Sequence, residues 1–216
     1  TIHAHRDMED LLRPQLDYFC RDIVFKVIIR PFDPAKSEII YEDRSIIVKT
    51  IPLQHRIPCA GFLFLEKPKE AHLIPEMIKF YNIPIKELRK IKQGADFVTE
   101  DGAIIENSRL TRPATPARSY AYCSDTAYDE RIIPIIEGVD LLYHEATFAE
   151  SDLARARNTS HSTAKQAAEI ARKANVKKLI LGHFSARYKD ARILSDEAKE
   201  VFENTILANE GLCEKL

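Results

Sequence analysis

Four of the seven histidines stand where an apolar run ends or where a helix is expected to begin. His55, His144 and His183 each follow such a run, and His161 precedes a predicted helix. Asp125 also follows an apolar run. Short strands that end in Asp or His bring these side chains to one edge of a sheet, where they face a common crevice. Imidazole nitrogen and carboxylate oxygen are ligands of Zn²⁺ and similar divalent ions, so the pattern predicts a metal site at that edge.

Each of these residues, taken singly, also has an ordinary structural explanation. A lone histidine at a strand end more often hydrogen bonds to a backbone carbonyl than binds a metal. Asp125, which precedes Thr126, is equally typical of a turn or a helix cap. The metal-site hypothesis therefore depends on several of these residues meeting in space.

The elements that would position these residues are typical of a layered α/β protein. Apolar runs predict strands over residues 23–29, 37–41, 45–51, 61–65, 120–123, 140–143 and 178–181. Helices are predicted over 71–81, 130–136, 163–174 and 195–202, and the third opens with the capping-box spacing of Thr163 and Gln166. Prolines and charges loosen the pattern over 67–118, so we expect a protruding insertion there, with a hairpin turn at 101–102.

The composition indicates a folded protein with no strong bias toward a charged partner. Of the 216 residues, 45% are hydrophobic and 30% charged, which excludes general disorder. Lys plus Arg number 32 and Asp plus Glu 33, so any nucleic-acid contact must come from a local basic patch. No apolar run reaches the roughly 18 residues of a membrane span. The four cysteines form no Cys-x-x-Cys motif, and we expect them to be reduced thiols of a cytoplasmic protein.

Three short motifs together resemble the ribonuclease Z family, the metallo-β-lactamase-fold endoribonucleases that remove the 3′ trailer from tRNA precursors. The most specific is His-Glu-Ala-Thr-Phe at 144–148, followed by His-Ser-Thr at 161–163 and His-Phe-Ser-Ala-Arg-Tyr at 183–188. The resemblance runs from near Ile2 to about Gly211, in the family's order and spacing. It implies an α/β, four-layer αβ/βα sandwich with an incomplete N-terminal part. Residues 1–216 would form one domain, with 67–118 as an arm.

The resemblance also implies a role for each residue of the site. His55 and His183 correspond to metal ligands, and Asp125 to the carboxylate that bridges two ions. His161 corresponds to the general acid that protonates the leaving 3′ oxygen, and Glu145 to the residue that orients it. General chemistry agrees with these roles, because two ions can share the charge of an in-line displacement, and a carboxylate keeps a neighbouring imidazole oriented and cationic.

The cofactor that the resemblance implies is zinc, with two ions per complete site and Mn²⁺ or Mg²⁺ as alternatives. The implied substrate is precursor tRNA, and the implied state is a cytoplasmic homodimer with no membrane contact. Arg187, shortly after His183, is expected either to meet a phosphate or to form a structural ion pair.

One departure from the family pattern concerns its first metal motif, His-x-His-x-Asp-His. His3, His5 and Asp7 imitate this motif, but Met8 stands in place of its last histidine and no apolar strand precedes it. By the resemblance, residues 1–8 are instead a strand-to-helix turn downstream of the motif. We therefore expect His3 and His5 to be surface histidines. We also expect the chain to begin partway through the enzyme, with an incomplete metal centre and impaired activity by itself.

The insertion corresponds, by the same resemblance, to the arm that grips the elbow of tRNA. Where the family has a Gly-Pro-rich turn, this chain has Ile-Pro-Ile-Lys at 83–86, without the glycine. Lys86, Arg89, Lys90 and Lys92 form a basic cluster on a nearly neutral chain, which predicts contact with RNA phosphates. A solvated helix face is the alternative explanation.

Two other functions compete with tRNA processing. One is a metallo-β-lactamase-fold phosphodiesterase or sulfatase that acts on small esters, which the arm-like insertion argues against. The other is a non-catalytic RNA-binding or dimerising fragment, which the incomplete metal motif would allow. Metal content separates the catalytic functions from the non-catalytic one.

Overall fold

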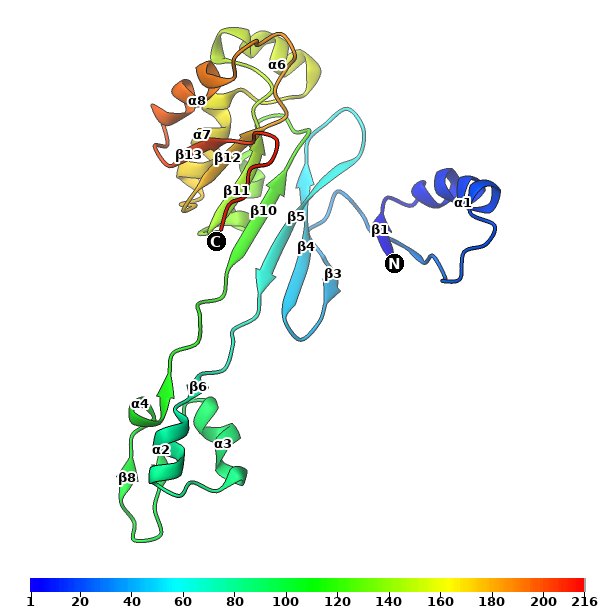
Figure 1. Cartoon of the computed structure of the whole chain (residues 1–216). Helices are drawn as coiled ribbons and strands as arrows, with labels where there is room; N and C mark the ends of the chain where they lie inside the picture. Colours follow the sequence, from blue (N-terminus) through cyan, green and yellow to red (C-terminus); the bar gives the residue numbers. More distant parts are fainter. Residues whose placement is uncertain (216) are drawn as a thin grey trace. The chain divides into compact units, whose positions relative to one another are not determined.

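The computed structural model describes residues 1–215, which divide into two compact units (Figure 1). Unit 1 comprises Thr1–Glu66 together with Arg118–Leu216, and unit 2 comprises Lys67–Ala117. Each unit has its own cluster of buried apolar side chains. Each therefore has the hydrophobic core that a separately folded unit needs.

Unit 1 is built around a seven-stranded mixed sheet in the order β13-β12-β11-β10-β5-β4-β3. The strands are β3 (Ile39–Glu42), β4 (Ile46–Leu53), β5 (Cys59–Glu66), β10 (Ser119–Cys123), β11 (Leu141–Glu145), β12 (Leu179–Gly182) and β13 (Thr205–Leu207). Strands β10 to β13 are parallel, whereas β5 is antiparallel to both β4 and β10. Strand β4 therefore runs in the same direction as β10 to β13, and the carboxyl ends of β4, β10, β11 and β12 meet at one edge.

Helices pack on one face of this sheet, so the predicted α/β layering is confirmed. The helical elements are η1 (Glu130–Ile132), α5 (Ile133–Ile136), η2 (Glu150–Asp152), α6 (Leu153–Thr159), α7 (Ala164–Lys173) and α8 (Arg192–Lys199). The predicted capping box of Thr163 and Gln166 forms at the start of α7. Four alanines and Ile170 of α7 are fully buried, and these small side chains let the helix lie close to β11 and β12.

The opposite face of the sheet carries a row of aromatic side chains. Phe64 stacks on Tyr120 with ring centroids 5.8 Å apart, and Tyr122 stacks on Tyr143 at 4.7 Å. Side chains two positions apart on a strand share a face, so Glu145 lies on the same face as Tyr143. A Cβ at Gly182 would lie 2.1 Å from Tyr143 Oη, so the end of β12 requires glycine for Tyr143 to keep this position.

The first residues of unit 1 form β1 (Ile2–Ala4), which pairs in parallel with β2 (Ile29–Pro31), and α1 (Met8–Phe19) between them. The predicted strand-to-helix turn over residues 1–8 is thus confirmed, and His3 and His5 are half-buried there. The predicted strand over 23–29 is wrong, because only Ile29 pairs with another strand. Val24 is 98% exposed, which shows that an apolar run alone does not make a strand without a partner.

Unit 2 is a small mixed unit around the buried side chains of Ile83, Ile91, Ile105 and Leu110. Its elements are β6 (His72–Leu73), α2 (Pro75–Phe80), α3 (Ile85–Lys92), β7 (Phe97–Val98), β8 (Ile104–Ile105), α4 (Asn107–Leu110) and β9 (Thr111–Arg112). The predicted turn at 101–102 joins β7 to β8, and Gly102 supplies its positive φ of 86°. The predicted helix over 71–81 is shorter, because β6 occupies its start and Pro75 opens the helix.

Some elements differ from the pattern-based prediction for identifiable reasons. Helix α1 buries none of its side chains, α6 is polar, and β13 has three residues, so none of them carries a strong periodic signal. Helix α8 begins at Arg192 and ends at Lys199, earlier at both ends than predicted. Within residues 1–215, no helix combines the length and apolar character needed to cross a membrane.

Candidate metal and catalytic site

The loops that follow four strands of unit 1 are tied together by backbone hydrogen bonds. After β4 and β10, the Ala127 N–H donates to the Gln54 carbonyl at 2.7 Å, and the Gln54 N–H donates to Thr126 Oγ1 at 3.1 Å. After β11, the Ala146 N–H donates to the Gly182 carbonyl at the end of β12, at 2.8 Å. These bonds hold the strand ends in register, so side chains from distant parts of the sequence meet at the predicted edge.

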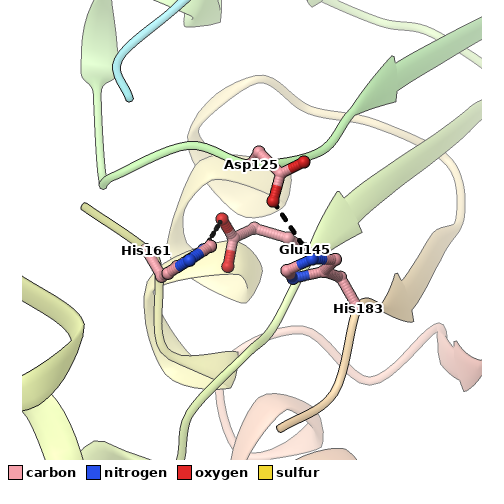
Figure 2. A group of neighbouring side chains, drawn as sticks. All are labelled: Asp125, Glu145, His161 and His183. Atoms are coloured by element: carbon pink, nitrogen blue, oxygen red, sulfur yellow. Dashed lines mark hydrogen bonds and ion pairs between the residues drawn. The ribbon is translucent and has the colours of Figure 1, made fainter. Parts of the chain in front are cut away.

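Four side chains meet there, as Figure 2 shows: Asp125, Glu145, His161 and His183. Their candidate ligand atoms all lie within 4.8 Å of one another. His183 Nε2 lies 3.0 Å from Asp125 Oδ1, and His161 Nδ1 lies 2.8 Å from Glu145 Oε1. The Asp125 and His183 side chains are 43% and 41% exposed, whereas Glu145 is fully buried. The group therefore consists of one open pair and one enclosed pair.

The backbone at this site adopts an unusual conformation at three points. Asp125, Ser160 and His183 have φ values of 59°, 59° and 57°, in the left-handed region that non-glycine residues rarely adopt. Each such residue costs about 1–3 kcal/mol and persists only where the surrounding structure enforces the conformation. Two of the three carry side chains of the group, and the third precedes His161. This concentration of strain at one edge is typical of a functional site.

Glu145 accepts hydrogen bonds from four directions. The Thr126 and Ser162 N–H groups donate to its carboxylate at 2.6 and 3.2 Å, and the Thr147 hydroxyl donates at 2.5 Å. His161 Nδ1 is the fourth partner. A buried carboxylate needs this many donors to offset its lost hydration. The network fixes Glu145 and thereby the ring of His161, whose Nε2 is the nitrogen that Glu145 does not engage.

His55 lies beside His161, and its ligand atoms are not part of the group of four. Its Nδ1 lies 3.0 Å from the Ser160 carbonyl oxygen, which leaves Nε2 available as a ligand. The ring centroid of His161 lies 5.0 Å from that of His55 and 5.3 Å from that of His183. His161 is therefore a neighbour of both histidines. The assignment of His55 as a metal ligand stays a prediction.

His144, the remaining strand-end histidine, points into the core. It is 1% exposed, and its Nδ1 lies 2.7 Å from the Glu145 carbonyl oxygen. Its Nε2 has no hydrogen-bond partner among the described residues. Burial lowers the pKa of the His144 imidazole, so the ring is held neutral. Strand alternation explains the difference, because His144 and Glu145 are neighbours on β11 and so face opposite sides of the sheet.

Two other titratable groups report the electrostatic character of this edge. Burial raises the pKa of the Cys59 thiol, and the negative charges of Asp125 and Glu145 raise it further. Burial likewise raises the pKa of Tyr143, with additional contributions from Tyr122 and from the same two carboxylates. Burial is the largest cause of both pKa shifts, and the nearby carboxylates of Asp125 and Glu145, which add to them, are groups that could bind a cation.

The residues predicted to contact RNA are not members of the group of four. Arg187 Nη1 lies 3.1 Å from Asp152 Oδ1, and its guanidinium lies over the Phe148 ring at 5.2 Å, so the structural ion pair is present. Lys86, Arg89 and Lys90 are exposed on α3 of unit 2, and Lys92 is half-buried at its end. Lys90 pairs with Glu87 at 3.0 Å. Phosphate contact by these residues stays a prediction.

Three hydroxyl residues of the site have no role predicted from the sequence: Thr126, Thr147 and Ser162. Thr147 contacts both Glu145 and His183, and the Ser162 hydroxyl donates to the Thr126 carbonyl at 2.7 Å. Each of these residues lies directly after, or two positions after, a member of the group of four. The available signal was that a buried carboxylate requires nearby donors, and short hydroxyl side chains can supply them.

Comparison with known proteins places these features in a family. The model of the "Beta-lactamase superfamily domain" matches residues 1–184. The chain is 56% identical over 212 residues to "Ribonuclease Z" of Bacteroides fragilis, covering 98% of this chain and 70% of that relative. It is 57% identical over 211 residues to "Ribonuclease Z" of Phocaeicola vulgatus, covering 98% and 68%. Such identity over nearly the whole chain carries more weight than any single motif.

Solved structures support the fold. Human tRNase Z, short form, superposes with a TM-score of 0.60 at 20% identity, covering 98% of this chain and 65% of that one. The metallo-β-lactamase fold protein YhfI of Bacillus subtilis gives a TM-score of 0.60 at 17% identity, covering 98% and 63%. This chain thus spans less than two thirds of each of these structures. The expected metallo-β-lactamase-type architecture, a large mixed sheet with helices, is confirmed.

Proposed function

Because the chain belongs to the ribonuclease Z family, with the domain of the β-lactamase superfamily, we propose that its site hydrolyses the phosphodiester bond that joins a 3′ trailer to a tRNA precursor. The names of the curated relatives and of the human structural neighbour support a tRNA-processing endoribonuclease. The two competing functions, hydrolysis of small esters and non-catalytic RNA binding, are not favoured by these relatives.

The observation that carries the proposal is an enclosed acid pair directly beside an open ligand pair. Glu145 holds His161 through Nδ1, so Nε2 is the atom that delivers a proton. In hydrolysis, the leaving 3′ oxygen of the ribose departs as an alkoxide unless it is protonated. His161 Nε2 supplies that proton, and the Glu145 carboxylate stabilises the imidazolium that precedes the transfer. Glu145 is thus a positioning residue for His161.

The open pair has the chemistry of a metal site. Asp125 Oδ1 and His183 Nε2 offer the oxygen and nitrogen donors that divalent ions prefer, at an edge with excess negative charge. A bound divalent ion would polarise the phosphoryl group and make water a stronger nucleophile at neutral pH. We propose Asp125 and His183 as ligands, with His55 contributing Nε2. Zinc, as two ions per complete site, is the proposed cofactor, with Mn²⁺ or Mg²⁺ as alternatives.

The remaining proposals concern the substrate and the assembly. Basic side chains on α3 of unit 2 are proposed to contact the phosphates of precursor tRNA, and Arg187 to exchange its carboxylate partner for a phosphate. The family resemblance supports a homodimer in the cytoplasm. Analytical ultracentrifugation checks the dimer, and a sedimentation coefficient of a monomer at micromolar concentration would contradict it.

The test of the proposed function compares two leaving groups in the protein expressed with every residue that its gene encodes. His161→Ala should lower the cleavage of a precursor tRNA about 10²–10⁴-fold, the usual contribution of a general acid. The same variant should lose much less activity on a nitrophenyl phosphodiester, because that leaving group departs without a proton. Glu145→Gln, which preserves the shape of the side chain, should show the same selectivity with a smaller loss.

Metal content is the control for this experiment. His161→Ala should keep the zinc content of the parent protein by elemental analysis. Equal losses of zinc and of activity on both substrates would make His161 a metal ligand and overturn the assigned role. A parent protein that binds metal but leaves precursor tRNA intact would overturn the proposed function.

A further inference from the structure

The hydroxyl of Thr147 lies between the two halves of the site. Thr147 is 6% exposed and follows the end of β11. Its backbone carbonyl accepts a hydrogen bond from the Ser185 N–H at 3.1 Å, which fixes the loop after β11 to the loop after β12. Its Oγ1 lies 2.5 Å from Glu145 Oε2 and 2.8 Å from His183 Nδ1. One small side chain thus contacts both the enclosed pair and the open pair.

The number of protons determines the direction of these hydrogen bonds. A hydroxyl group has one proton to donate, and a carboxylate oxygen can only accept. Oγ1 also lies 3.0 Å from the His183 carbonyl oxygen, but the Glu145 carboxylate is both nearer and charged, so the proton of Thr147 goes to Glu145. The contact between Oγ1 and His183 Nδ1 then requires the imidazole to donate, so Nδ1 carries a hydrogen. In a neutral ring, Nε2 is then left with its lone pair at 3.0 Å from the acceptor oxygen Asp125 Oδ1, and two acceptors at this distance require a shared cation, either a metal ion or a second ring proton.

We propose that Thr147 is a positioning residue that selects the Nδ1–H tautomer of His183 and so prepares Nε2 to bind the metal ion. This inference rests on the metal site of the proposed function. A carboxylate, a hydroxyl and an imidazole form a chain in which each donor points toward Glu145. Partners of this kind fix the orientation of a ligating histidine and raise its basicity. Glu145 therefore contacts His161 directly and is connected to His183 through the Thr147 hydroxyl.

The experiment measures the tautomer and the metal affinity separately. The ¹⁵N shifts of the His183 ring, assigned with a His183→Gln variant, report the tautomer in the metal-free protein. The spectra are recorded at alkaline pH, over a range in which the ¹⁵N shifts no longer change. We expect the Nδ1–H tautomer in the parent protein and a shift toward the Nε2–H tautomer in Thr147→Val. Thr147→Ser, which keeps the hydroxyl, should retain the Nδ1–H form.

Zinc titration against a competing chelator gives the second readout. Thr147→Val should weaken zinc binding about 10- to 100-fold, the usual effect of removing a hydrogen-bond partner of a ligand. Thr147→Ser should stay close to the parent value. Thr205→Val is the matched control, because Thr205 is also buried in unit 1 and its hydroxyl donates to the Phe202 carbonyl.

The outcomes separate this inference from the function on which it rests. If the parent protein binds no zinc, the proposed metal site fails, whereas the ¹⁵N shifts still test the selection of the tautomer. An Nε2–H tautomer in the parent protein would overturn the inference, even if Thr147→Val did not fold. Equal zinc affinity in the folded Val and Ser variants would overturn it as well.

Discussion

In unit 1, the residues of the site come from segments between Gln54 and His183, whereas the basic residues of unit 2 lie on the single helix α3. The site residues are connected by hydrogen bonds that cross the sheet edge, and Glu145 at their centre is fully buried. On α3, Lys86, Arg89 and Lys90 are exposed, and their positions follow from helical geometry alone. Chemistry at a buried carboxylate thus requires long-range order, whereas an electrostatic surface requires only a stable helix.

The two hydrophobic cores also differ in how far apart in the sequence their residues lie. The core of unit 1 joins strands β4, β5, β10, β11 and β12 to helices α7 and α8. The core of unit 2 contains four buried apolar residues, all between Ile83 and Leu110. Disturbing the first core should therefore reach the site, whereas disturbing the second should leave it intact.

Core truncations provide the largest expected effect. Leu142→Ala and Ile91→Ala each truncate a side chain that is at most 1% exposed. Each variant should lower the free energy of unfolding of the unit that contains it by about 2–5 kcal/mol. Hydrogen exchange measured by mass spectrometry should show faster exchange across β10–β12 for Leu142→Ala. For Ile91→Ala, it should show faster exchange only within residues 67–117.

Exposed residues of each unit give the matching controls. Ile193 and Ile104 are 51% and 67% exposed, so their alanine variants should barely change the exchange. Zinc binding should weaken in Leu142→Ala and stay unchanged in Ile91→Ala. A loss of zinc binding in Ile91→Ala would show that the two units depend on one another.

Removal of charge from α3 is expected to have an intermediate effect. The double variant Lys86→Ala/Arg89→Ala should weaken binding of precursor tRNA about tenfold and lower the slope of log K against log salt by about two, one for each phosphate contact. Filter binding over a range of salt concentrations measures both quantities. Cleavage of a small phosphodiester should be unchanged. A tRNA affinity equal to that of the parent would mean that α3 is merely a solvated helix.

The smallest expected effect is a pH dependence of stability from His144. Burial lowers the pKa of this imidazole below its ordinary value of 6.5, so the unfolded chain binds a proton that the folded chain excludes. The stabilisation that comes from keeping His144 neutral is therefore complete when the pH lies above that ordinary value. It is lost as the pH falls below that value. Urea denaturation between pH 5 and pH 8 measures this loss. The variant His144→Phe should lack this component, and an unchanged pH profile would contradict the assignment.

Several features of both units followed from the sequence because they depend on local chemistry. The capping box of Thr163 and Gln166, the turn at Gly102 and the strand end at Cys123 all formed as the local pattern predicted. The motif at 144–148 likewise indicated the family. Each of these signals lies within a few residues of chain, where spacing and side-chain type are sufficient.

Only the tertiary structure decided which of the strand-end residues meet. His144 and His183 both end apolar runs, yet the alternation of β11 buries one, and the left-handed backbone at the other turns it toward Asp125. The run over residues 23–29 failed as a strand because pairing needs a neighbour that no local pattern specifies. Thr147 gained its role because the β11 and β12 loops bring Glu145 and His183 within reach of one hydroxyl. Residue types set what each side chain can donate or accept, whereas the packing of distant segments decides which partners it finds.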